Sequence, residues 1–261
     1  MSNFLCKGLF QQPIKSLFSK SNLIIARYCK NTTLTEPIPF SKDFLFRQMF
    51  DPVSCTYTYL LADITGKTAV LIDPVMEWAE RDKAVISELG LILKYAINTH
   101  MHADHITGTG RLKCLLPGCQ SMISRSSGAK ADILLNPGDE ISFGRHHLRI
   151  LSTPGHTEGN IHFSSINLYR GGSAEVLYNS VHSQIFTLPS NYRLYPAHDY
   201  SGRTVTTVAE EKVLNPRLTK SLDEFVHIMN NLNLPYPKMI DKAVPANKVC
   251  GLYEVQDAQK Q

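Results

Sequence analysis

Short apolar runs separated by turn residues fill the chain from about residue 44 onward. Runs of this length, rich in Val, Ile, Leu, Phe and Tyr, predict strands at 44–50, 55–61, 69–72 and 91–97. The second run alternates polar and apolar residues, which predicts a strand buried on one face. Helical spacing over 80–89 stops at Gly90, a residue suited to a left-handed helix end.

Strands and helices keep alternating towards the end of the chain, without an internal repeat. The pattern predicts strands at 121–124, 141–143, 147–151, 160–163 and 192–195, and helices at 106–116 and 177–186. Thr207-x-x-Glu210 and Ser221-x-x-Glu224 are capping-box patterns that predict helices at 208–214 and 222–232. No linker interrupts this part, so we predict one α/β domain of mixed layers over about 40–255.

The composition indicates a folded domain behind a basic leader. A chain of 261 residues, 43% of them hydrophobic, can bury a sizeable core. The formal net charge is +4, but residues 1–31 hold five basic residues and no acid, and subtracting them leaves a body near −1. We therefore expect no nucleic-acid partner.

The leader, residues 1–30, has the composition of a mitochondrial transit peptide followed by a linker. It is rich in Ser, Lys and Leu, and its apolar residues fit one face of a helix. We expect cleavage near 27–31 and a matrix location; the alternative is a disordered tail. No run of about 18 apolar residues occurs, so no membrane partner is expected. The six cysteines include no Cys-x-x-Cys pair, which argues against a disulfide scaffold and a structural zinc finger.

Three loops that follow predicted strands carry the residues of a metal site. His100-x-His102-x-Asp104-His105 comes directly after strand 91–97. Imidazole nitrogen and carboxylate oxygen are ligands of zinc and iron, and strand ends can present them together. His156, in a Pro-Gly-His-Thr turn, and His198, in Pro-Ala-His-Asp, follow two further strands.

Other histidines and thiols lack this context. Cys55 and Cys250 are interpreted as buried apolar thiols, because neither has a base beside it in sequence. The remaining histidines are interpreted as surface or structural groups: His146, His147, His162, His182 and His227.

In this order the three motifs resemble the metallo-β-lactamase superfamily, whose fold is an αββα sandwich. Within it, the segments 71–75, 103–108, 195–200 and 244–247 resemble the mitochondrial persulfide dioxygenases, over about 46–251. The resemblance implies a mononuclear Fe(II) enzyme that oxidises glutathione persulfide with O₂ to sulfite and glutathione, in sulfide catabolism. It implies one Fe²⁺ per chain and allows a homodimer.

The resemblance also assigns roles to residues. His100 and His156 correspond to the two histidine ligands of the iron. Tyr200 is a candidate substrate-binding residue. The remaining residues are expected to orient ligands or, alternatively, to hold a second metal: His102, Asp104, His105, His198 and Asp199.

The resemblance breaks after Tyr169. The family takes its third iron ligand from a Gly-Asp pair on the strand after Pro-Gly-His-Thr, followed by an Arg-Thr-Asp segment lining the glutathione pocket, and neither is present. Between His156 and Asp199 the only acids are Glu158 and Glu175. We interpret this as an internal deletion that removes a strand and the third ligand, and we expect weakened iron binding. Glu175 and Asp104 are the candidate substitute carboxylates.

Two other functions are compatible with the motifs. A hydrolase of the glyoxalase II kind would use the same loops to hold two metals and activate water for thioester hydrolysis. A non-catalytic truncated isoform would have a weaker fold and bind no metal. Assays of thioester hydrolysis and of persulfide oxidation distinguish the hydrolase from the dioxygenase.

Overall fold

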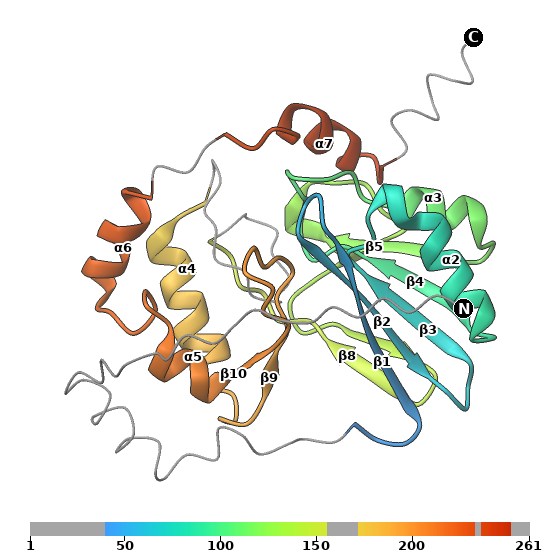
Figure 1. Ribbon diagram of the computed structural model, residues 1–261, viewed down its shortest axis with the longest axis horizontal. Coiled ribbons are helices and arrows are strands. Elements are labelled where there is room, and N and C mark those ends of the chain that lie inside the picture. The colour runs from blue at the N-terminus through green and yellow to red at the C-terminus, as the bar shows by residue number, and fades with distance from the viewer. Residues whose placement is uncertain (1–39, 156–171, 233–235, 252–261) are drawn as a thin grey trace, which may run out of the picture. The chain divides into compact units, whose positions relative to one another are not determined.

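A six-stranded mixed sheet organises the fold, in a computed structural model that describes residues 40–155, 172–232 and 236–251 (Figure 1). Its strands, in sheet order, are β1 (Phe44–Asp51), β2 (Thr56–Asp63), β3 (Thr68–Ile72), β4 (Ile92–Ile97), β5 (Gln120–Ser124) and β6 (Ile133–Leu135). The first three are antiparallel neighbours, and β3 to β6 pair in parallel. The carboxyl ends of β3, β4 and β5 therefore meet at one edge, the usual place for a site in such a sheet.

The second strand is buried on both faces, so the prediction of a half-buried strand was wrong. All eight residues of β2 are buried. Leu60 packs in the cluster on one face of the sheet, and Tyr59 and Leu61 pack in the cluster on the other. The polar position Thr58 is tolerated because its hydroxyl donates to the carbonyl of Asp73 at 2.8 Å.

Two helices cover one face of the sheet (Figure 1). They are α2 (Ala79–Glu88), which follows the short turn η2 (Met76–Trp78), and α3 (Thr109–Leu115). Ile86 and Leu112 are fully buried against the sheet. Gly90 follows α2 with a φ of 62°, as predicted. The helix predicted at 106–116 begins later, because backbone bonds to Pro74 and Met76 hold the chain before Thr109.

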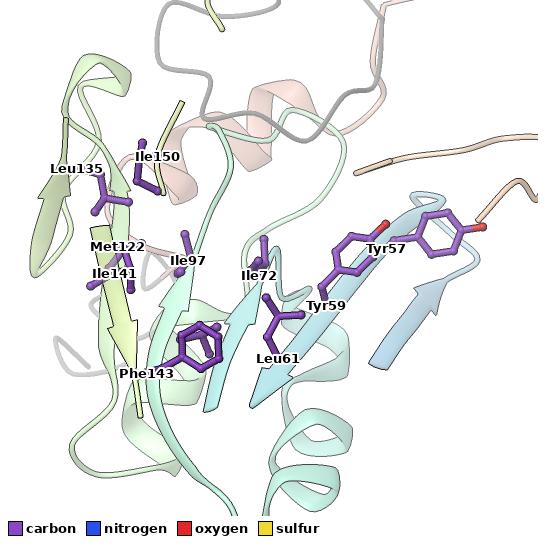
Figure 2. Packing of buried hydrophobic residues seen from close by; sticks show 11 residues of the cluster. Tyr57, Tyr59, Leu61, Ile72, Ile97, Met122, Leu135, Ile141, Phe143 and Ile150 are labelled. Carbon is purple, nitrogen blue, oxygen red and sulfur yellow. The ribbon is translucent and has the colours of Figure 1, made fainter. Parts of the chain in front are cut away.

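A hairpin covers the opposite face. It consists of β7 (Glu140–Phe143) and β8 (His146–Arg149). A cluster of buried side chains from the sheet and the hairpin lies between these two layers (Figure 2). Phe143 sits in this cluster with no exposed surface, beside Ile72 and Ile97 of the sheet. A second ladder of the fold pairs β9 (Arg193–Leu194) with β10 (Thr206–Thr207).

The sequence break falls between these two ladders along the chain. Within the described ranges, β7–β8 and β9–β10 are separate two-stranded ladders. The predicted strand at 160–163 and the predicted ligand His156 lie outside the described residues. The deletion was expected to remove a strand from this part of the fold.

Helices after the break form a cluster of their own. They are α4 (Ala174–Ser180), which continues as the π-helical turn η4 (Val181–Ile185), α5 (Val208–Leu214) and α6 (Leu222–Asn230). The predicted box at Ser221 is complete, since its hydroxyl accepts from the Glu224 amide and the Glu224 carboxylate accepts from Ser221. At Thr207 the hydroxyl likewise accepts from the amide of Glu210. Both predicted helices and the box at Ser221 are confirmed. The box at Thr207 is half formed, because the Glu210 carboxylate accepts from the Thr206 hydroxyl at 3.2 Å instead.

Several elements were not predicted. Four of them, β6, β10, η2 and the turn η3 (Arg125–Ser127), are only two or three residues long. Helix α7 (Ile240–Asn247) contains Pro245, which sequence rules treat as a helix breaker. Among the described residues, no helix is long and apolar enough to cross a membrane.

Candidate metal centre

The loop after β4 gathers the histidines at the edge of the sheet. His100, His102 and His105 are 7%, 1% and 4% exposed. Ligand atoms lie within 4.8 Å of one another in two overlapping groups, one formed by the side chains of His100, His102 and His198, the other by those of His102, Asp104 and His105. Five of the predicted site residues therefore come together.

Asp73 anchors the start of this loop from the end of β3. Its Oδ1 accepts from the Thr99 amide at 2.7 Å and lies 3.0 Å from His102 Nε2, and its Oδ2 accepts from the Thr99 hydroxyl at 2.8 Å. Burial raises the pKa of Asp73 to about 6, against the opposing effect of the hydrogen bonds from Thr99. At neutral pH the carboxylate is therefore ionised and accepts all three bonds.

These bonds fix which nitrogen of two imidazoles carries a lone pair. An ionised carboxylate only accepts, so His102 donates from Nε2 and keeps its lone pair on Nδ1. The Thr99 hydroxyl gives its one proton to Asp73, so the 2.9 Å contact with His100 requires donation from His100 Nδ1. The lone pair of His100 is then on Nε2. Each ring is held in one orientation through one of its nitrogens, as in metal-binding histidines.

Asp104 holds the other two imidazoles. Its Oδ2 lies 3.2 Å from His105 Nδ1 and 3.4 Å from His198 Nδ1. The hydroxyl of Thr56 lies 3.2 and 3.1 Å from the same two nitrogens. Among the described residues His105 Nε2 has no hydrogen-bond partner, although it is buried. Such a nitrogen is the position that a metal ion would satisfy.

The electrostatics of the cluster favour a neutral His198 and an ionised Asp104. Burial raises the pKa of Asp104, but the hydrogen bond from His105 and the charges of the neighbouring imidazoles outweigh it and hold this pKa below its usual value. Burial lowers the pKa of His198, against the attraction of Asp104. Metal binding requires both of these protonation states.

The loop of His198 is placed by the first residues of β2. The Tyr57 amide donates to the carbonyl of Ala197 at 2.8 Å, and the Asp199 amide donates to that of Cys55 at 3.2 Å. Thr56 forms an isolated antiparallel bridge with His198. Backbone pairing therefore joins two motifs that lie some 140 residues apart in the sequence.

The donor set fits a divalent transition metal. Four imidazoles and one carboxylate are gathered, and His102 Nδ1 lies 3.8 Å from Asp104 Oδ1. Two ligands that each bind an ion at about 2.1 Å lie roughly 3 to 4 Å apart, so this spacing suits one ion. Imidazole with carboxylate is compatible with both zinc and iron.

Two predicted residues lie outside the described groups of ligand atoms. Asp199 accepts from the amides of Ser201 and Arg203, both at 2.8 Å, so it shapes the loop after His198. Tyr200 is 62% exposed.

The turn before His156 is described up to Gly155, and it packs on α4. The Ser180 hydroxyl donates to the carbonyl of Pro154 at 2.9 Å, and the Ser173 amide donates to that of Gly155 at 2.9 Å.

Three positioning residues were missed by the sequence analysis: Thr56, Asp73 and Asn247. A strand that ends in Asp73-Pro74 gave a signal for one of them, because a carboxylate at a strand end can reach a neighbouring loop. For the other two we find no local signal.

Comparison with known proteins places this site in a family. The model of the metallo-β-lactamase superfamily matches residues 52–117. The mitochondrial persulfide dioxygenase ETHE1 of Mus musculus is 57% identical over 226 residues, covering 80% of this chain and 89% of that protein, and the Homo sapiens protein gives the same values. The chain belongs to the persulfide dioxygenase family. This confirms the resemblance and makes the chain a member of a family of enzymes.

Solved structures confirm the fold. The crystal structure of ETHE1 from Myxococcus xanthus is 44% identical, with a TM-score of 0.76, and covers 79% of this chain and 99% of that one. A metallo-β-lactamase from Staphylococcus aureus gives a TM-score of 0.72 at 21% identity, covering 81% of this chain and 73% of that one. The predicted metallo-β-lactamase-like α/β fold is therefore correct.

The match with the mouse persulfide dioxygenase also bears on the deletion. Its 226 positions cover only 80% of this 261-residue chain, and 80% of 261 is about 209. The alignment therefore includes about 17 positions at which this chain has no residue, which is the difference between 226 and 209.

Proposed function

We propose that this chain is an Fe(II)-dependent persulfide dioxygenase that oxidises glutathione persulfide with O₂ to sulfite and glutathione. The observation that carries the proposal is the buried imidazole cluster, in which Asp73, Thr99 and Asp104 hold one nitrogen of each ring and the ligand atoms lie within 4.8 Å of one another in two groups. The membership of the chain in the persulfide dioxygenase family supports the substrate.

Iron would be held by His100 and His156, with a carboxylate as third ligand. When bound, iron supplies open coordination positions and the redox states that zinc lacks. Of the two substitute carboxylates, Asp104 is the better candidate, because it lies in the histidine cluster, grouped with His102 and His105, whereas Glu175 is exposed on the first turn of α4. The Asp104 carboxylate already lies beside the imidazoles of His105 and His198, so it would be a poorer iron ligand than a carboxylate that binds only the metal. We therefore expect iron to be held less firmly than in full-length relatives.

The chain's own residues would keep the site ready for the reaction. Asp73 and Thr99 hold His100 with its lone pair on Nε2. Burial of the histidines limits the access of water to the reacting atoms. We assign substrate contact to Tyr200 and loop positioning to Asp199.

A thioester hydrolase with a dinuclear site is the second candidate. It is favoured by the two overlapping groups of ligand atoms around His102, which would allow two ions. In that case His102, Asp104, His105 and His198 would bind metal directly.

We further propose that residues 1–30 direct the chain to the mitochondrial matrix and that 40–255 form the catalytic domain. The relatives from mouse and human are named mitochondrial, and the basic, acid-free leader supports an import signal. The near-neutral body gives no reason to expect a nucleic-acid or membrane partner, and a homodimer is the proposed assembly.

The experiment is metal analysis with two assays on anaerobically purified protein. We expect iron uptake from added Fe(II), and O₂ consumption with glutathione persulfide that exceeds hydrolysis of a glutathione thioester. His100→Ala should lose both iron and activity. His147→Ala, which changes an exposed histidine on β8, is the matched control and should lose neither. Thioester hydrolysis alone would select the hydrolase, and absence of bound metal would select the non-catalytic isoform.

A further inference from the structure

We propose that Asn247, on the C-terminal helix α7, is a positioning residue that fixes the histidine loop for metal binding. The proposal deepens the proposed function and rests on it for the identity of the site. The Asn247 side chain is 4% exposed. Its Nδ2 donates to the carbonyls of His102 and His105 at 2.8 and 2.9 Å, and its Oδ1 accepts from the amide of Thr107 at 2.8 Å.

These three bonds satisfy backbone groups that the loop cannot pair by itself. Apart from an isolated bridge between Thr107 and Val75, the chain between β4 and α3 forms no helix or strand over residues 98–108, yet it is largely buried. Buried carbonyls and amides need partners, and Asn247 supplies three within six residues. A primary amide has two donors and an acceptor in fixed geometry, so one side chain sets the relative positions of His102, His105 and Thr107.

The segment that follows β3 also anchors the loop. The Met76 amide donates to the carbonyl of Ile106 at 2.9 Å, and the Gly108 amide donates to that of Pro74 at 2.8 Å. Asp73, in the same segment, binds Thr99 and His102. Asn247 is therefore a second anchor of the loop, and it comes from a helix some 140 residues away in the sequence.

The residues after Asn247 keep α7 against the loop. The Gly110 amide donates to the carbonyl of Cys250 at 3.0 Å, and the Lys130 amide donates to that of Lys248 at 2.9 Å. Gly251 has a φ of 76°, and a Cβ there would collide with the carbonyl oxygen of Thr107. Close backbone approach and left-handed geometry both require glycine at this point. The C-terminal segment is thus docked at several places, and Asn247 is the contact that reaches the histidines.

Two substitutions distinguish the hydrogen bonds of Asn247 from the space that its side chain fills. Asn247→Asp keeps the size and the acceptor for Thr107, but turns a carboxylate oxygen towards two carbonyls. Asn247→Ala removes all three bonds. Asn215→Asp is the matched control, because the Asn215 side chain also binds backbone amides, those of Arg217 and Leu218, away from the histidine cluster.

The test has one readout without metal and one with Co(II). In the metal-free chain, hydrogen exchange of residues 99–110 should rise in both Asn247 variants and stay unchanged in Asn215→Asp. Titration with Co(II), followed by its visible absorption, should show affinity roughly 10- to 100-fold weaker and an altered spectrum, as for other residues that orient ligands.

Unchanged exchange in 99–110 together with wild-type Co(II) affinity would overturn the proposal. If the unsubstituted chain itself binds no Co(II), the proposed metalloenzyme function fails, and the exchange measurement alone decides the role of Asn247. If neither variant folds, Asn247→Gln, which retains the amide, serves as the second test. Failure of all three to fold, with Asn215→Asp folded, would make Asn247 purely structural and overturn the proposal.

Discussion

The carboxylate of Asp73 lies 3.0 Å from Nε2 of His102, and both side chains are about 1% exposed. Asp73 directly follows strand β3 and has a φ of 50°, a left-handed conformation that is unusual outside glycine. Its backbone carbonyl accepts from Thr58 of β2, so the residue is held from both sides. A rigid element of the sheet thereby sets the orientation of an imidazole in the metal loop.

Replacing Asp73 by Asn should weaken metal binding by about 10- to 100-fold, the usual effect of losing a group that orients a ligand. The new amide nitrogen donates where the carboxylate accepted, which reverses the direction of bonding through Thr99 and turns His100 to the wrong tautomer. Co(II) titration measures the change. Asp82→Asn removes a different fully buried carboxylate and should leave the affinity unchanged. Equal affinity in Asp73→Asn and the unsubstituted chain would show that Asp73 does not act through the histidines.

Replacing Gly155 by Ala should destabilise the fold by more than about 2 kcal/mol, because strain and a steric clash combine. The φ of Gly155 is 126°, and a Cβ there would collide with the backbone of Leu177 in α4. Gly118→Ala is the matched control, since Gly118 has a φ of 94° but open space around it. Urea unfolding of both variants distinguishes the cost of backbone strain from the cost of the steric clash with α4. Similar losses in the two would mean that the contact with α4 contributes nothing.

Asp82 should make stability depend on pH in a known direction. Burial raises its pKa to about 6, only partly offset by the charge of Arg81. The folded state therefore binds a proton that the unfolded state releases near pH 4, and this contribution to stability is lost as the pH rises through 6. Asp82→Asn does not titrate. Its free energy of unfolding, relative to the unsubstituted chain, should increase by about 1.4 kcal/mol from pH 5 to pH 7.5.

Urea unfolding at the two pH values measures this difference. Histidine titration affects both proteins equally, so the comparison isolates Asp82. A relative stability of Asp82→Asn that falls as the pH rises would contradict the raised pKa.

Replacing Phe143 by Ala should cost about 3 to 5 kcal/mol, the range for a large aromatic side chain deleted from a core. Phe143 is fully buried between the hairpin and the sheet (Figure 2). Its ring lies 6.3 Å from that of Phe44. Thermal unfolding of Phe143→Ala and Phe143→Leu gives the test, with Leu expected to lose less. A loss below about 1 kcal/mol would place the ring outside a well-packed core.

The sequence predicted what local pattern determines. Apolar runs located β3 and β4, and His100-x-His102 identified the edge of the sheet because strand ends present their following residues together. Contacts between residues far apart in the sequence could not be predicted from these local patterns. Asn247 reaches the loop from a helix that contains Pro245, and Thr56 reaches His198 through a single bridge. Neither residue type nor spacing marks these two, since Asn and Thr are common throughout the chain.

The break after Tyr169 is the feature that most affects function. The resemblance to the persulfide dioxygenases indicated that the Gly-Asp pair is missing, and the described cluster offers Asp104 as the nearby carboxylate.

The most direct test of the central claim is O₂ uptake dependent on glutathione persulfide, measured on the anaerobically purified chain after loading with Fe(II). We predict O₂ consumption in proportion to bound iron, with sulfite as product, at a lower iron occupancy than the mouse persulfide dioxygenase reaches under the same conditions. His100→Ala should abolish it and His147→Ala should not. Iron bound near one per chain without any persulfide-dependent O₂ uptake would contradict the proposed dioxygenase activity.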